Sequence, residues 1–71
     1  MDRFAKNLAA ARENAGLSRT ELAAKIYAAP MSVRKWENGV VYPHVTTLIL
    51  ISDVLGVSID DLVKGEIWNT T

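Results

Sequence analysis

The chain has 71 residues, which fits one small domain, and 49% of them are hydrophobic, which favours a folded core over disorder. It has no cysteine, so we expect neither a disulfide framework nor a thiolate zinc site, and a reducing compartment such as the cytoplasm is the natural location. No apolar run approaches the ~20 residues of a membrane helix, and residues 1–10 lack the continuous apolar stretch of a signal peptide.

The net charge is zero, which argues against a strongly basic, non-specific nucleic-acid binder. The charge is nevertheless unevenly distributed along the chain. Residues 1–37 hold seven Lys or Arg and four Asp or Glu, a net charge of +3, and residues 38–71 hold one Lys and four acidic residues, a net charge of −3. The first half would suit phosphate, although small domains also show such imbalance by chance.

A first helix is predicted after Asp2, which can act as its N-cap, and before Gly16, which can end it. Its apolar face is predicted from residues that recur at spacings of three and four: Phe4, Leu8, Ala11 and Ala15. The opposite side is predicted to carry Arg3, Lys6, Asn7, Arg12 and Glu13.

Two further helices are predicted at about 18–26 and 30–38. Ser18 and Glu21 form the S-x-x-E pattern of a capping box, which starts the first of them. Pro30 suits the first turn of the second, because that position needs no N–H partner. Val33 and Trp36 are predicted to be buried, and Asn38-Gly39 supplies the left-handed residue that ends the helix. Only about three residues join the two helices, so they must cross steeply.

A fourth helix is predicted at about 45–55, ended by Gly56, and a short fifth helix after a second capping box at residues 58–61, ended by Gly65. The predicted core face of the fourth helix consists of Val45, Leu48, Ile49, Ser52 and Leu55. The predicted fold is therefore all-α, a compact domain of five helices.

Three segments resemble a known family. They are L-S-x-x-E-L-A-x-K-I, S-V-R-K-W-E-N-G-x-x-Y-P and, at 55–62, L-G-V-S-I-D-D-L. Together they are similar to the Cro/repressor-type (Xre-like) helix-turn-helix DNA-binding domains. The resemblance implies a domain at 1–65 with its motif at about 18–38, followed by a C-terminal tail at 66–71. In that family the second helix of the motif enters the major groove and the first crosses the DNA backbone.

Phosphate contacts are expected at both ends of the motif. Arg19 stands where the family commonly has a polar residue that touches the backbone, and a guanidinium at a helix start can hold phosphate bidentately. The alternative for Arg19 is a solvated side chain. The resemblance also implies phosphate contact by Asn38 and Gly39, through their backbone N–H groups and the Asn38 amide.

The start of the second motif helix departs from the family. Ala29, Pro30 and Met31 stand where many members have Ser or Thr followed by Gln or Arg, and these three side chains cannot hydrogen-bond base edges. We therefore expect direct readout by Ser32, Arg34 and Lys35, with Met31 or Ala29 touching a thymine methyl. Tyr27 replaces the usual glycine of the turn, so either it adopts an unfavourable φ at a cost of roughly 1 kcal/mol or the turn is rebuilt.

A homodimer interface is predicted around Leu50, Ile67 and Trp68. Residues 48–51 are apolar at four successive positions, so a helix that buries one face leaves at least one of them exposed. Ile67 and Trp68 are apolar residues in a polar tail, and a second copy of the chain would cover all three. The alternative is that the tail folds back over its own fourth helix.

An enzyme is not expected, because the chain has one His, no Cys and no Gly-rich phosphate loop; no metal or other cofactor is expected either. The sequence predicts a sequence-specific, repressor-like transcriptional regulator of phage or bacterial type that binds double-stranded DNA. The alternative is a protein-interaction module, antitoxin-like or anti-repressor, that keeps the helix-turn-helix fold and binds a protein partner.

Overall fold

The computed structural model describes residues 2–69, which form five α-helices and one short 3-10 helix. They are α1 (Asp2–Asn14), α2 (Arg19–Lys25), α3 (Pro30–Glu37), α4 (Val45–Leu55), α5 (Ile59–Lys64) and η1 (Ile67–Asn69). The predicted all-α class and the predicted places of the five helices are confirmed; η1 was not predicted. No helix in this part of the chain has the length and apolar character needed to span a membrane.

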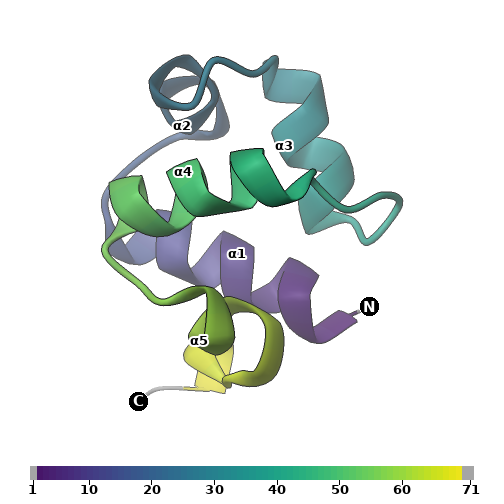
Figure 1. The fold of residues 1–71 in the computed structure, drawn as a ribbon, viewed down its shortest axis with the longest axis vertical. Coiled ribbons are helices and arrows are strands. Elements are labelled where there is room, and N and C mark those ends of the chain that lie inside the picture. Colours follow the sequence, from purple (N-terminus) through teal and green to yellow (C-terminus); the bar gives the residue numbers. More distant parts are fainter. Residues whose placement is uncertain (1, 70–71) are drawn as a thin grey trace.

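The helices are arranged along a molecule that measures 29 × 23 × 19 Å. Helices α2 and α3 lie at one end of the longest axis, α5 and η1 lie at the other, and α1 and α4 cross the middle (Figure 1). The first turn of α5 carries Asp60 and Asp61. The charge imbalance along the sequence therefore becomes a separation in space, with these carboxylates far from the α2–α3 end.

One apolar core joins all five helices. Its largest members include Leu8 of α1, Leu22 of α2, Ile51 of α4 and Leu62 of α5, which are fully buried. Trp36 of α3 belongs to the same core and is only 7% exposed, as its spacing from Val33 predicts. Since an indole covers a large apolar area, Trp36 ties α3 to the rest of the domain.

The predicted core face of α4 is partly wrong. Val45 is 71% exposed and Ile49 is 45% exposed, whereas Ile51 is fully buried. Leu48 and Leu55 pack against the core as predicted. Because residues 48–51 are all apolar, periodicity alone does not fix the rotation of this helix. The packing of α4 against α2 and α5 decides it.

Both predicted sides of α1 are also partly wrong. Asn7 and Arg12, predicted on the polar side, are buried, and Ala15, predicted on the apolar face, is exposed. The Asn7 Nδ2 group donates to the carbonyl oxygens of Asp61 at 3.1 Å, Leu62 at 2.9 Å and Gly65 at 2.9 Å. Its Oδ1 atom accepts from the Ile67 N–H at 2.6 Å. A buried amide is tolerated here because every polar atom has a partner. The prediction that Asp2 caps the first helix depends on a side chain that lies outside the described part of the structure.

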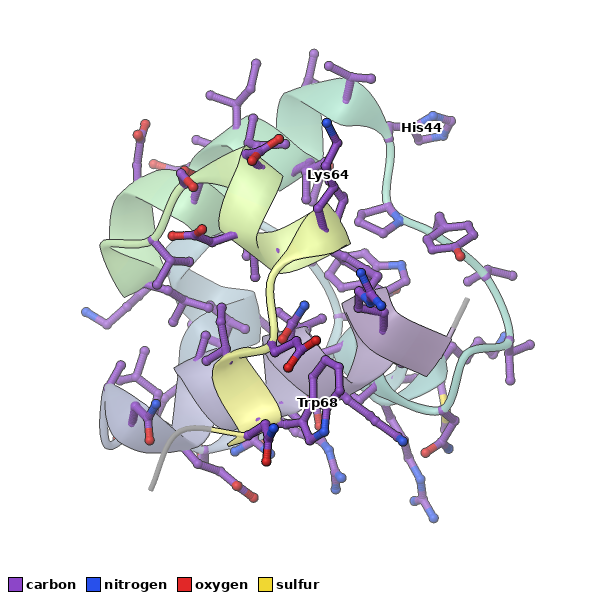
Figure 2. The ribbon with its side chains drawn as sticks, turned by 90° about the horizontal axis from the view of Figure 1, so that it is seen from below. His44, Lys64 and Trp68 are labelled. Carbon is purple, nitrogen blue, oxygen red and sulfur yellow. The ribbon has the colours of Figure 1, made fainter. Side chains whose placement is uncertain are left out.

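The described part of the tail, residues 66–69, folds back on α1. Helix η1 packs against α1, and the Lys6 ammonium lies 5.5 Å from the centroid of the Trp68 ring, which Figure 2 shows over α1. The fold-back alternative named the fourth helix, and the structure places the contact on the first. At Gly65 an added Cβ would lie 2.5 Å from the Asp61 oxygen, so this close approach of α5 to the tail requires glycine.

Candidate nucleic-acid interface

Helix α2 begins with the predicted capping box. The Ser18 Oγ accepts from the Glu21 N–H at 3.0 Å, and the Ser18 N–H donates to the Glu21 carboxylate at 2.8 Å. Hydrogen bonding by Ser18 to the Glu21 carboxylate lowers the pKa of Glu21; the backbone N–H of Ser18 is the main cause and its side chain is the second. The box fixes the first turn of α2 and thereby the position of Arg19, its first residue.

The turn between α2 and α3 keeps its shape without glycine. Tyr27 adopts φ 59°, and the next N–H, that of Ala28, donates back to Ala23 O at 2.9 Å, as in a Schellman ending. The Tyr27 side chain is 90% exposed. Of the two alternatives, the strained φ is therefore confirmed and the rebuilt turn is wrong.

Helix α3 presents a polar and apolar mixture on its outer side. It begins at Pro30, and its N-cap residue, Ala29, makes no side-chain hydrogen bond. Because Val33 and Trp36 turn inward, the exposed residues are Ala29, Pro30, Met31, Arg34 and Lys35, while Ser32 is half-buried. The residues predicted to contact bases thus lie along one helix, with Ser32 the least accessible of them.

A cleft of about 290 Å³ separates the starts of α2 and α3. It is lined by Arg19, Thr20, Pro30, Met31 and Arg34. The structure therefore brings together a predicted phosphate contact, Arg19, and two predicted base contacts, Met31 and Arg34; Lys35 is not part of this lining. Thr20 was not predicted as a site residue. Its place beside Arg19 in the first turn of α2 could have indicated that it lines the same cleft.

A buried carboxylate holds Arg19 in place. The Glu37 side chain is 2% exposed and accepts from Arg19 Nε at 2.9 Å and from Arg12 Nε at 2.6 Å. Arg12 also donates from Nη2 to Glu37 at 3.2 Å and from Nη1 to the Leu17 oxygen at 2.8 Å. The hydrogen bond to Glu37 is the main cause that raises the pKa of Arg12. Arg12, which the sequence predicts on the polar side of its helix, is therefore the buried partner of Glu37.

Arg19 itself remains accessible, with 47% of its side chain exposed. Within residues 2–69 its hydrogen bonds involve Nε alone. The network therefore fixes the guanidinium through Nε, and within residues 2–69 neither Nη group makes a hydrogen bond. A preoriented pair of N–H donors of this kind matches the oxygens of a phosphate.

At the end of α3, the backbone N–H groups of Asn38 and Gly39 make hydrogen bonds within the chain. The Asn38 N–H donates to Arg34 O at 2.9 Å, and the Gly39 N–H donates to Trp36 O at 3.2 Å. Both backbone donors are thus used within the helix end, and the phosphate contact of Asn38 and Gly39 stays a prediction. The exposed amide side chain of Asn38 is the group that remains for such a contact.

The residues predicted for a dimer interface do not form one exposed patch. Leu50 and Ile67 are half-buried and pack against the core of their own chain, and Trp68 is 38% exposed. More exposed apolar side chains occur from the α3–α4 loop into α4: Val40, Val41, Tyr42, Val45 and Ile49. His44, the N-cap residue of α4, makes no side-chain cap bond and projects away from the helices in Figure 2.

These features define a class of protein. Two short helices, joined by a tight turn at one end of a five-helix domain, place the outer side of the second helix beside the start of the first. This is a helix-turn-helix domain. Among residues 2–69 no group of three acidic or histidine side chains is placed to hold a metal ion.

The chain belongs to the helix-turn-helix family, which it matches over residues 8–62. It is 35% identical over 63 residues to the HTH-type transcriptional activator BcrR of Enterococcus faecalis, a match that covers 89% of this chain and 31% of BcrR. The chain thus spans about a third of the length of that curated relative. Its fold is similar to the solution structure of the DNA-binding domain of the P22 C2 repressor, with a TM-score of 0.85, 22% identity and coverage of 100% of this chain and 96% of that one.

Proposed function

We propose that this domain binds double-stranded DNA as a transcription regulator, with α3 in the major groove and the start of α2 on the backbone. The observation that carries the proposal is the cleft where Arg19 and Thr20 of α2 meet Met31 and Arg34 of α3. Phosphate donors and groove-facing side chains lie side by side there, as a helix-turn-helix contact requires. Because the proposed ligand is DNA, we also propose that the protein acts in the cytoplasm.

The residues divide between two tasks. Arg19 and the Asn38 amide are proposed to contact phosphate, and Met31, Ser32, Arg34 and Lys35 are proposed to contact bases. Glu37 supports the first task, because an arginine whose Nε is already fixed loses less side-chain freedom when it binds. Arg34 shares the cleft with Arg19, so its contact with bases needs a separate test.

The direct act of the regulator is proposed to be the sequence-specific occupation of an operator. The sequence predicts repression, whereas the curated relative is named an activator and the similar structure is that of a repressor domain. Occupation by itself is compatible with both outcomes, because a bound protein blocks or recruits polymerase according to the position of its site. We propose repression at an operator that overlaps a promoter.

We also propose a homodimer, because one short helix reads few base pairs and a two-fold dimer reads two half-sites about 34 Å apart. The sequence places Leu50, Ile67 and Trp68 at its centre. Since Leu50 is half-buried, we propose that Val45 and Ile49, which are more exposed on the same helix, supply much of the apolar contact on the α4 side.

A second candidate function, binding of a protein partner, is favoured by one observation. Ala29, Pro30 and Met31 make the start of α3 apolar and exposed, and exposed apolar surface often marks protein contacts. This candidate differs from DNA binding in its response to salt, since contact between apolar surfaces releases no counterions.

The test measures binding of fluorescent duplex DNA by anisotropy at several salt concentrations, together with selection from a random duplex pool. We expect log K to fall against log[salt] with a slope of about −0.9 per phosphate neutralised. Arg19→Gln should lower that slope by about 1 and keep the selected sequence, whereas Lys35→Gln should change the sequence. Lys64→Gln, an exposed lysine at the opposite end, is the matched control and should change neither. Wild-type protein that binds no duplex would overturn the proposal in favour of a protein partner.

A further inference from the structure

The cleft between the starts of α2 and α3 holds polar groups that are not used within their own chain. Arg19, Arg34 and Thr20 line it, and all three are exposed. In the part of the chain that the structure describes, the Arg34 and Thr20 side chains make no hydrogen bond or ion pair, and Arg19 makes them through Nε alone. The Nη groups of both arginines and the Thr20 hydroxyl are therefore available to a ligand.

The charge of the cleft exceeds what one phosphate of DNA neutralises. Its lining contains two arginines and no carboxylate. Arg34 keeps its whole charge, and Arg19 keeps part of its charge because it shares Glu37 with Arg12. A phosphodiester of DNA carries one negative charge, whereas a phosphate monoester carries almost two near neutral pH and has three terminal oxygens. The cleft therefore matches a phosphate monoester better than a phosphodiester.

An apolar wall completes the cleft. Pro30 and Met31 lie in its lining beside the arginines, and the Met31 side chain is 57% exposed. The volume of about 290 Å³ is close to the ~300 Å³ at which small-molecule sites begin. A flexible thioether adapts to the shape of a ligand and packs favourably against an aromatic ring. The wall thus suits the apolar part of a ligand whose phosphate faces the arginines.

We propose that this cleft binds a small phosphate monoester that carries an aromatic group. Arg19 and Arg34 hold the terminal phosphate oxygens through their Nη groups, as guanidinium groups commonly do. Thr20 donates its hydroxyl to the same phosphate, and Pro30 and Met31 cover one face of the ring. Free in solution, such a ligand is a different one from the DNA duplex.

The consequence is regulation by competition. Arg19, Met31 and Arg34 are also proposed to contact DNA, so one cleft serves both ligands and they exclude each other. A small molecule of this class therefore releases the domain from its operator. The competition rests on the DNA-binding function proposed above, whereas the binding of the monoester does not.

The first experiment titrates isotope-labelled protein with phenyl phosphate at neutral pH and constant ionic strength, and follows the backbone and arginine N–H signals by NMR. We expect saturable shifts centred on Arg19, Thr20, Met31 and Arg34. Inorganic phosphate lacks the ring and should bind about tenfold more weakly, the factor expected from covering roughly one face of a ring. Benzenesulfonate keeps the ring but carries one negative charge, so it should also bind more weakly than phenyl phosphate.

Three variants assign the binding to the cleft. Arg34→Gln should weaken phenyl phosphate binding about tenfold, because a charge-assisted contact is lost. Met31→Ser should bring the affinities for phenyl phosphate and inorganic phosphate close together. Lys35→Gln is the matched control, since Lys35 is an exposed cation of the same helix that does not line the cleft, and it should change neither affinity. Circular dichroism checks that all three variants are folded.

The second experiment adds phenyl phosphate to the domain in the presence of fluorescent duplex DNA, with sodium chloride used to keep the ionic strength constant. Competition for one cleft predicts that the apparent Kd for the duplex doubles when the phenyl phosphate concentration equals its own Kd. In Arg34→Gln the same relative effect should need about tenfold more phenyl phosphate. Benzenesulfonate at equal concentration should displace less DNA.

The outcomes separate this inference from the function proposed above. Wild type without saturable shifts, or Arg34→Gln that binds phenyl phosphate as tightly as wild type, would overturn the site. Equal affinity of wild type for phenyl phosphate and inorganic phosphate would indicate an adventitious ion only and overturn the ligand class. Phenyl phosphate that binds without displacing the duplex would overturn the competition. Wild type that binds phenyl phosphate but no duplex would support the ligand site and overturn the DNA-binding function.

Discussion

Glu37 shows how one residue can serve the core and the surface together. Its carboxylate binds the buried Arg12 on one side and the half-exposed Arg19 on the other. A buried ion pair contributes little net stability compared with apolar packing, but removal of one partner is costly because the other charge is left without compensation. Here Arg12 compensates the buried charge of Glu37. The bond between Glu37 and Arg19 can therefore serve to orient the Arg19 guanidinium at the cleft.

At the same scale, Tyr27 holds the one left-handed backbone conformation of a non-glycine residue within residues 2–69. Its side chain is 90% exposed, so little burial offsets the strain. We expect Tyr27→Gly to stabilise the domain by roughly 0.5–1 kcal/mol, the left-handed strain less the larger backbone entropy of glycine. Urea denaturation followed by circular dichroism measures this difference.

The control for that prediction is Tyr27→Ala, which removes the aromatic ring and keeps the strain. It should leave the free energy of unfolding almost unchanged. If Tyr27→Gly lowers stability, the ring makes contacts that its exposure does not reveal, and the strain argument fails.

At the scale of elements, the capping box makes the start of α2 depend on pH. The pKa of Glu21 is lowered by its bonds from Ser18, so the ionised carboxylate favours the folded state. This contribution to stability is complete above the pKa that Glu21 has in the unfolded chain. It is lost as the pH falls through the lower pKa that Glu21 has in the folded state. Glu21→Gln lacks it at every pH.

We therefore expect the stability advantage of wild type over Glu21→Gln to be constant near neutral pH and to shrink in acid, below the ordinary pKa of a glutamic acid. Denaturation of both proteins over a pH series measures it. An advantage that persists unchanged at the acid end would show that the charge of Glu21 is not what stabilises the cap.

Asn7 performs a similar task between elements, because it closes the C-terminal end of α5 from α1. Asn7→Ala removes four hydrogen bonds, of which the bond to the Leu62 oxygen is buried and the other three are partly buried. The loss of hydrogen bonds at buried and partly buried backbone groups costs about 1–3 kcal/mol at the buried site and less at each of the others, so we expect a loss of at least about 3 kcal/mol in the free energy of unfolding. Amide hydrogen exchange should also become faster in residues 59–69.

The matched control is Arg3→Ala. Arg3 also donates from α1 to this region, to the Lys64 oxygen at 3.0 Å, but the bond is exposed to solvent. It should cost about 0.5 kcal/mol, since water replaces the lost donor. If Asn7→Ala were as mild as Arg3→Ala, water would have to reach the carbonyl groups beneath α1.

At the scale of the whole molecule, the fold separates its charges and leaves apolar surface between them. The cationic cleft lies at the α2–α3 end, and Asp60 and Asp61 lie at the other (Figure 1). In a dimer on DNA each copy would direct its acidic end away from the phosphates, which reduces repulsion. Apolar side chains of α4 are then available for the contact between copies.

The predicted consequence concerns association. Val45→Lys combined with Ile49→Lys introduces charges at two exposed positions one helical turn apart, so the variant should remain folded and sediment as a monomer where wild type sediments as a dimer. Val63→Lys, at an exposed apolar position of α5, is the control and should sediment like wild type.

Two results would contradict this arrangement. Wild type that is monomeric at high protein concentration would overturn a dimer free in solution. If Trp68→Ser alone produced monomers while the α4 double variant stayed dimeric, the contact would lie at the tail, as the sequence analysis predicts.

The sequence by itself determined the five α-helices and the motif, because their signals are local. Ser18 and Glu21 meet within one turn, Pro30 starts α3 and Gly39 takes a left-handed φ of 74° at its end. Short-range signals of this kind need no knowledge of distant residues. The family and the place of its motif followed from the same segments.

The tertiary structure alone decided which polar residues are buried and which apolar ones are not. Asn7 and Arg12 look like surface residues in the sequence, and they are buried because Leu62, Gly65 and Glu37, distant along the chain, bind their polar atoms. The rotation of α4 likewise came from its packing against other helices. Periodicity records only the order of residues along one helix, whereas burial depends on partners that the fold brings from elsewhere in the chain.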